Sequence, residues 1–194
     1  MRILVIDDAE YNRASALLTL AGHDVLVVDN VSRAFKFLDG HRPRFDAVLT
    51  DLMMPIGNFR GAISKSATPP QMEIPAGLVF ALKASNLGIR SVICSDSNHR
   101  LDWICALLDL LMDKHGSQKA RMSDPAKRVA FVELGTVPMT AVWDDKQKAI
   151  VFDAGCWKQD VPRIKDWHEA MIESGLFPEI EPAPIRRESE VQRV

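Results

Sequence analysis

The chain has 194 residues, a formal net charge of −2 and 26% charged residues of both signs. This length is enough for one sizeable hydrophobic core, or for one domain with an added segment. The near-neutral charge gives no reason to expect electrostatic binding to nucleic acid or to an anionic membrane. No apolar run is long enough to cross a bilayer, and the N-terminus starts directly with a strand pattern, so neither a membrane span nor a signal peptide is expected.

The three cysteines, Cys94, Cys105 and Cys156, are odd in number, widely spaced and set among apolar residues. This pattern is typical of reduced core thiols, whereas a disulfide framework or a zinc site needs paired or closely spaced cysteines. The sequence therefore favours a cytoplasmic protein.

Strand and helix patterns alternate along the first 51 residues. Residues 2–6, 24–28 and 45–51 are short apolar runs, as in strands that are buried on both faces. Residues 10–21 and 31–38 carry apolar side chains at helical spacing between those strands. The buried stripe of the first helix is predicted to consist of Ala14, Leu17, Leu18 and Ala21. Such alternation predicts right-handed crossovers and a parallel sheet covered on both faces.

The alternation continues to about residue 135. Helical spacing returns over 75–88, a strand is predicted over 91–94, a further helix over 97–116, and a fifth strand over 129–134 after the polar connection 117–127. The apolar stripes are predicted to include Leu78 and Leu82, with Ala81 as a further candidate, in the first of these helices and Met112 in the second. Five strands and about four helices predict a doubly wound α/β domain.

Three segments fall outside this pattern. Residues 56–74 lose periodicity and form a long loop, which in a compact domain is either functional or disordered. Residues 136–177 contain a β-hairpin and an amphipathic helix that ends at Gly175, and they are predicted to be an appendage. Residues 178–194, rich in proline and in charges of both signs, are predicted to be a disordered tail.

Three of the predicted strands end at polar side chains. Asp7 and Asp8 follow the first strand, Asp51 ends the third, and Ser95 follows the fourth. In open α/β sheets ligands bind at this edge, so these side chains are expected to form one cluster. Neighbouring carboxylates repel one another unless a proton or a cation neutralises them, and oxygen ligands favour Mg²⁺. The alternative, that the aspartates only cap helices, is weaker for several strand ends together.

The chemistry that this cluster suggests is phosphoryl transfer to a carboxylate. In this hypothesis Asp51 accepts the phosphoryl group, and Mg²⁺ is held by Asp8, Asp51 and a backbone carbonyl near Met53. Asp7 then orients metal-bound water. Ser95 hydrogen-bonds the new phosphoryl oxygens and draws its own loop inward.

The same residues carry a family resemblance. The apolar run that ends at Asp7 and Asp8, then Asp51 followed by Met54 and Pro55, then Ser95, resembles the receiver domain of two-component response regulators over residues 1–135. The resemblance implies a flavodoxin-like fold with a five-stranded parallel sheet. It also implies Mg²⁺ dependence and phosphorylation of Asp51 by a histidine kinase or a phosphotransfer protein.

No catalytic or DNA-reading module follows the receiver-like part of the sequence. We therefore expect a stand-alone receiver that signals through contact with an unknown downstream protein. By resemblance, the face with the fourth helix and the fifth strand is the signalling surface. No enzymatic activity is expected beyond slow loss of the phosphoryl group to water. The sequence does not fix the oligomeric state, so a homodimer stays open.

Receivers also carry a lysine at the end of the fifth strand, but that strand ends here in Val132-Glu133-Leu134-Gly135. The sequence leaves four candidates for this lysine open: Lys114, Lys119, Lys158 and Lys165. A degenerate pseudo-receiver, which binds partners without being phosphorylated, is the first alternative. A Mg²⁺-dependent phosphohydrolase is the second, although Met53 stands where a general acid is expected. A nucleotide-binding protein is the third, although the turn after the first strand lacks glycines.

Overall fold

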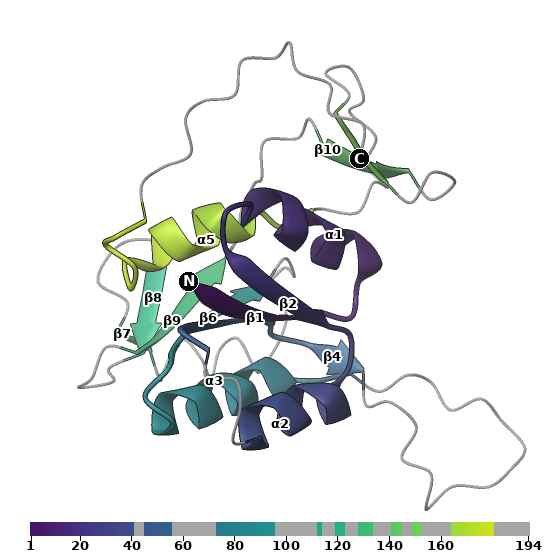
Figure 1. Ribbon diagram of the computed structural model, residues 1–194. Helices are drawn as coiled ribbons and strands as arrows, with labels where there is room; N and C mark the ends of the chain where they lie inside the picture. Colours follow the sequence, from purple (N-terminus) through teal and green to yellow (C-terminus); the bar gives the residue numbers. More distant parts are fainter. Residues whose placement is uncertain are drawn as a thin grey trace, which may run out of the picture.

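A seven-stranded β-sheet forms the centre of the protein (Figure 1). The computed structural model describes residues 1–40, 45–55, 73–95, 112–113, 119–122, 128–133, 141–144, 149–152 and 164–180. The sheet order is β2-β1-β3-β6-β9-β8-β7. Its first five members in that order are β2 (Asp24–Val28), β1 (Arg2–Ile6), β3 (Ala47–Asp51), β6 (Arg90–Ser95) and β9 (Val129–Glu133).

These five strands run parallel to one another. Their order, with the first strand between the second and the third, is that of flavodoxin-like domains. The predicted α/β class and the five-stranded parallel sheet are therefore confirmed.

Two antiparallel strands extend this sheet beyond β9, and the sequence analysis did not predict them. They are β8 (Lys119–Met122) and β7 (Met112–Asp113). Met112 was assigned to a helix and residues 119–122 to a connection; both assignments are wrong. Short strands with mixed polarity give no clear period-two signal, so pairing with β9 decides their conformation.

Apolar side chains alternate between two cores along the central strands. Ile3 and Val5 of β1 face one cluster of buried residues, while Leu4 and Ile6 face another. Successive side chains of a strand point to opposite faces, and both faces are covered by helices here. This explains why the strands are apolar throughout.

Of the helices that the structure describes, two lie on each face of the sheet (Figure 1). Helices α1 (Glu10–Thr19) and α5 (Trp167–Ser174) lie on one face, and α2 (Val31–Asp39) and α3 (Ala76–Asn86) on the other. Each pair contributes side chains to the core on its own side. Together with the parallel strands, they form a three-layered α/β sandwich.

The buried stripes of two helices differ from the prediction. In α1 the buried residues are Asn12, Ser15 and Ala16, while Leu17 is 55% exposed. In α3 the candidate Ala81 is buried as expected, but Phe80 is buried too, whereas Leu82 is 43% exposed. The prediction for α1 was wrong because it assumed that the apolar residues define the buried face, and two polar residues lie there instead.

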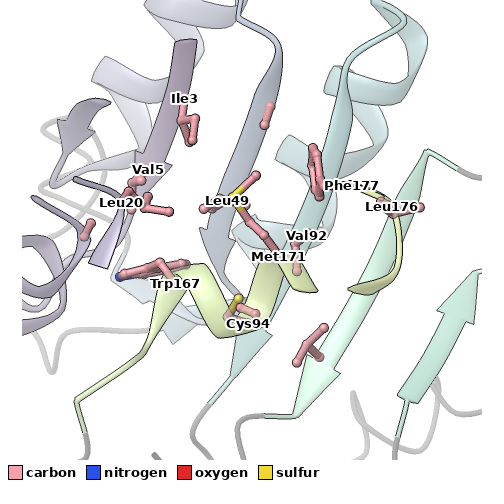
Figure 2. Packing of buried hydrophobic residues seen from close by; sticks show 14 of the residues in the cluster. Ile3, Val5, Leu20, Leu49, Val92, Cys94, Trp167, Met171, Leu176 and Phe177 are labelled. Atoms are coloured by element: carbon pink, nitrogen blue, oxygen red, sulfur yellow. The ribbon is translucent and has the colours of Figure 1, made fainter. Parts of the chain in front are cut away.

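Helix α5 was assigned to an appendage, but the structure places it against the sheet. Trp167 and Met171 are fully buried in the same cluster as Ile3, Leu49 and Val92 (Figure 2). Gly175 ends the helix with a positive φ of 61°, as the sequence predicts.

The turn after α5 is tied to the start of β6. Arg90 donates a hydrogen bond to the backbone oxygen of Leu176 at 2.8 Å and pairs with Glu179 at 2.5 Å. Its guanidinium also lies 4.5 Å from the centre of the Phe177 ring. Residues 176–179 therefore belong to the sheet domain as well.

Two small antiparallel pairs complete the described part of the chain. Strands β4 (Met54–Pro55) and β5 (Glu73–Ile74) join the two ends of the long predicted loop. Strands β10 (Ala141–Asp144) and β11 (Ala149–Phe152) form the predicted hairpin, and β11 lies against α1.

Some predictions lie outside the described residues. They include the interior of the long loop (56–72), most of the helix over 97–116, and all but the first three residues of the predicted tail. Cys105, Cys156 and two of the candidate lysines, Lys114 and Lys158, also lie outside the described residues. Among the helices that the structure describes, none has the length and apolar character needed to span a membrane.

Candidate functional site

Acidic residues gather at the carboxyl edge of the parallel sheet. Asp7 follows β1, and Asp51 is the last residue of β3, which pairs in register with β1 through Ile6 and Thr50. Carboxylate oxygens of Asp7, Asp8 and Asp51 all lie within 4.8 Å of one another. The cluster that the sequence predicts is therefore formed.

Asp7 is completely buried, and several donors hold its carboxylate. The backbone N–H of Ala9 donates to Oδ1 at 2.9 Å, and Nδ2 of Asn12 lies 3.2 Å from Oδ1 and 3.1 Å from Oδ2. Arg13 donates to the backbone oxygens of Asp7 and Asp8 at 2.9 and 2.6 Å. A buried charge is tolerated only with such partners, so this turn has one defined conformation.

The ammonium of Lys165 completes the acidic cluster. Its Nζ lies 2.8 Å from Oδ2 of Asp7 and 2.7 Å from Oδ1 of Asp51, and the residue is only 2% exposed. This lysine immediately precedes the cap of α5, where Asp166 accepts a hydrogen bond from the N–H of Glu169. Lys165 was one of four candidates in the sequence, and the structure selects it.

The first turn of α3 packs against the end of β3. The N–H of Leu52 donates to Oδ1 of Asp51 at 2.8 Å, and the N–H of Gly77 donates to the oxygen of Leu52 at 3.1 Å. A Cβ on Gly77 would lie 2.0 Å from the backbone oxygen of Asp51. Only glycine allows the first turn of α3 to approach the aspartate this closely.

A pocket of about 190 Å³ opens over the cluster. By the same measure a single water needs about 10–15 Å³, so the pocket has room for an ion and a small anion together. The described residues that line it are Asp7, Asp8, Ala9, Tyr11, Asn12, Asp51, Met53, Glu73, Ser95 and Lys165. The predicted residues Met53 and Ser95 thus border the same space as the aspartates.

The donor set fits a divalent cation. Three carboxylates and one ammonium give a formal charge of −2, which a single divalent ion would balance. Oxygens that share one Mg²⁺ are up to about 4.2 Å apart, so small side-chain rotations would suffice. Asp8, Asp51 and the backbone carbonyl of Met53 are the groups that would hold the ion, as the sequence suggested.

Two titratable groups in or beside the site have a shifted pKa. Partial burial, and then the carboxylate of Asp7, raises the pKa of Asp8 above its ordinary value, and Glu73 adds to the effect. Burial strongly raises the pKa of the Cys94 thiol, which lies beside Asp51 in the register of β3 and β6. Cys94 is therefore an unreactive core thiol, as predicted for it.

Sequence reasoning did not find four features of the site. Asn12, Gly77 and Glu73 were not singled out, and Lys165 was not ranked above the other lysines. One signal was available for Lys165, because it directly precedes the last predicted helix and so lies at the sheet edge where that helix begins. For Asn12 the sequence offered no comparable signal.

Comparison with known proteins finds only distant structural similarities. No family model matches the chain, and no curated protein does. One similar structure is the N-terminal domain of a response regulator/sensory box/GGDEF three-domain protein from Carboxydothermus hydrogenoformans. It is 15% identical, with a TM-score of 0.37 over 53% of this chain and 70% of the other. A second is a fusion that carries the trimeric coiled coil of yeast Spc42, 13% identical, with a TM-score of 0.38 over 71% and 70%.

Proposed function

We propose that the protein is a phosphoacceptor receiver that takes a phosphoryl group on Asp51 in the presence of Mg²⁺. The observation that carries this proposal is the position of Lys165, whose ammonium contacts Asp51 and Asp7 beside the acidic cluster. A carboxylate that only capped a helix would need neither a buried lysine nor two further aspartates. The proposal also agrees with the sequence resemblance.

In the proposed reaction a carboxylate oxygen of Asp51 attacks the phosphorus of a phosphohistidine donor. An O–P bond forms to Asp51 while the N–P bond of the donor breaks, and the imidazole nitrogen keeps that electron pair and takes up a proton. Mg²⁺, when bound, neutralises charge on the transferring oxygens. Lys165 supplies a positive charge next to Asp51, and the Ser95 hydroxyl at the pocket wall supplies a hydrogen bond.

The proposed donor is a sensor histidine kinase or a phosphotransfer protein, and the proposed output is a contact with another protein. The pocket supports a small tetrahedral anion as the group that enters, because its size and its lysine suit one. Multiple turnover is not expected, since Met53, which has no proton to donate to a departing alcohol, stands two residues after Asp51, where a general acid is expected.

Phosphorylation of the pure protein tests this proposal. The full chain is incubated with acetyl phosphate and Mg²⁺, and intact mass is measured before and after acid treatment. We expect one acid-labile phosphoryl group that is lost in Asp51→Asn and without Mg²⁺. Asp39→Asn, at an exposed pair with Lys83, serves as the matched control and should be modified like the wild type.

The other outcomes point to the alternatives. If no adduct forms and Mg²⁺ does not change thermal stability, the protein is a binding module that acts without phosphorylation. If inorganic phosphate is released over many turnovers without accumulation of the adduct, the protein is a phosphohydrolase.

A further inference from the structure

Asn12 occupies a position on α1 where a helix that covers a sheet normally buries an apolar side chain. It is 2% exposed, and it contacts both the acidic cluster and the segment that carries Lys165. Its Nδ2 lies 3.2 and 3.1 Å from the two carboxylate oxygens of Asp7. Its Oδ1 accepts a hydrogen bond from the backbone N–H of Lys165 at 3.0 Å.

The orientation of this amide is fixed by its surroundings. The N–H of Lys165 is a donor and the carboxylate of Asp7 is an acceptor, so the amide oxygen must face the lysine and the amide nitrogen must face the aspartate. The flipped amide would lose its hydrogen bonds to Asp7 and Lys165. It would also place its oxygen against the Asp7 carboxylate and its nitrogen against the N–H of Lys165. Asn12 therefore joins Asp7 to Lys165 in one arrangement only.

A second residue of α1 holds the other side of the Lys165 peptide. Ser15 lies one helical turn after Asn12, and its hydroxyl donates to the backbone oxygen of Lys165 at 2.6 Å. The indole N–H of Trp167 donates to the backbone oxygen of Asn12 at 2.9 Å. Helix α1 thus binds both the N–H and the C=O of Lys165, although Asn12 and Ser15 lie 150 residues or more before Lys165 in the sequence.

We infer that Asn12 is a positioning residue that fixes Lys165 against Asp7 and Asp51, with Ser15 as its auxiliary. Lysine has four rotatable bonds, so a lysine on a loosely held backbone would sample many positions. The hydrogen bonds of Asn12 and Ser15 with the backbone of Lys165 confine the ammonium to the two carboxylates. The consequence for phosphoryl transfer rests on the proposed function, but the positioning itself does not.

Chemical labelling of Lys165 tests the positioning without any phosphoryl donor. The full chain, in Mg²⁺-free buffer, is treated with acetic anhydride, and modification of Lys165 and of the surface residue Lys83 is followed by mass spectrometry. In Asn12→Ala we expect the ratio of Lys165 to Lys83 modification to rise by about tenfold, because the donor to Asp7 and the acceptor for the lysine N–H are both lost. Ser174→Ala, which removes a buried hydroxyl at the other end of α5, should leave the ratio unchanged.

Circular dichroism and thermal unfolding show whether each variant is folded. A folded Asn12→Ala protein with the wild-type ratio would overturn the inference. If Asn12→Ala does not fold, Ser15→Ala decides, because it removes one donor and leaves only a small void. A rise of about threefold in the ratio of Lys165 to Lys83 modification then supports the inference, and no rise overturns it.

The same variants separate this inference from the proposed function. With acetyl phosphate and Mg²⁺, the rate at which Asn12→Ala takes up a phosphoryl group should be about tenfold lower than that of the wild type. Mg²⁺ alone should still raise the melting temperature of this variant. If neither the wild type nor the variant takes up a phosphoryl group, the proposed function fails, and the labelling ratio still tests the role of Asn12.

Discussion

Lys165 is the residue on which the electrostatic balance of the site depends. It is a buried cation between two carboxylates, one of which, Asp7, has no exposed surface. Removing one member of a buried ion group leaves the others uncompensated, and this usually costs about 3–5 kcal/mol. A divalent ion bound at the same carboxylates would replace part of the missing charge.

We therefore expect Lys165→Met to lower the free energy of unfolding by about 3–5 kcal/mol in EDTA and to recover part of it in Mg²⁺. The Mg²⁺-dependent gain should exceed that of the wild type, as measured by urea denaturation with and without the ion. Lys83→Met, at a partly exposed surface pair, should change stability by less than about 1 kcal/mol in either buffer. Equal gains from Mg²⁺ in wild type and Lys165→Met would contradict the predicted sharing of charge.

Asp8 gives the site its pH dependence. Its pKa is raised by partial burial and by Asp7, so the ionised form is disfavoured in the folded protein. The cost of ionised Asp8 is fully present above the folded-state pKa and disappears as pH falls through it toward the ordinary value of 3.8. Because Mg²⁺ needs the ionised carboxylate, its stabilising effect should decrease over the same interval.

The measurement is the difference in melting temperature with and without Mg²⁺ between about pH 7 and about pH 4. In the wild type this difference should shrink with a midpoint above 3.8. In Asp8→Asn it should be small at every pH. A wild-type difference that stays constant down to pH 4 would mean that Asp8 does not bind the ion.

At the scale of elements, the approach of α3 to β3 places Asp51. A methyl group on Gly77 would overlap the backbone oxygen of Asp51 at 2.0 Å. Helix propensity alone predicts that Gly77→Ala stabilises the protein by about 0.5–1 kcal/mol. We expect the opposite sign, a loss of about 1–3 kcal/mol from overpacking, together with weaker Mg²⁺ binding as Asp51 moves.

Chemical denaturation and Mg²⁺ titration check this expectation. Gly22→Ala provides the comparison, since Gly22 has a φ of 99° but nothing within 4 Å of an added Cβ. It should cost about 1–2 kcal/mol from backbone strain and leave Mg²⁺ binding unaltered. If Gly77→Ala were stabilising, the close contact with Asp51 would not exist in solution.

The strands were predictable from the sequence because both of their faces are buried. An apolar run such as residues 2–6 has few other uses, and each predicted strand of the parallel sheet lies within two residues of its observed bounds. The acidic ends followed from the topology, since parallel strands deliver Asp7 and Asp51 to one edge. These features depend on local pattern and on one general rule of sheet architecture.

The rest of the site depends on contacts between distant residues, and local pattern does not report them. Lys165 lies 114 residues after Asp51 and 158 after Asp7, so nothing in its neighbours identifies these partners. Asn12 and Ser15 look like surface residues of an amphipathic helix, and their burial makes sense only once the backbone of Lys165 is placed beside them. Polar residues that satisfy each other across a core are therefore the main source of error in the predicted helix faces.

At the scale of the molecule, residues 164–180 act as an integral part of the sheet domain. They contribute Trp167, Met171 and Phe177 to the core cluster that also holds Ile3 and Val5 of β1 (Figure 2). Loss of a buried tryptophan alone costs about 3–5 kcal/mol, which is a large fraction of the stability of an ordinary domain.

Shortening the chain tests this assignment. Residues 1–163 alone should show no cooperative thermal transition, because the core cluster around Ile3 and Val92 would be exposed. Residues 1–180 should melt within about 2 °C of the full chain, which also tests the predicted tail. Cooperative unfolding of residues 1–163 would show that the last helix is dispensable for the fold.

The extension of the sheet also affects which surfaces a partner can use. Strand β8 pairs with β9, so the fifth parallel strand is an interior strand. Strand addition by another protein at β9 is thereby excluded, although resemblance to receivers would place signalling contacts near it.

The distance in sequence between Lys165 and its two aspartates affects the order of events on the ribosome. Chains emerge with the N-terminal part first, at about 5–20 residues per second. The strands that carry Asp7 and Asp51 are therefore made several seconds before the lysine that balances them. During that interval the nascent sheet holds unmatched negative charge, which ambient divalent ions can screen, and the acidic cluster is balanced by its lysine only once residue 165 has been added.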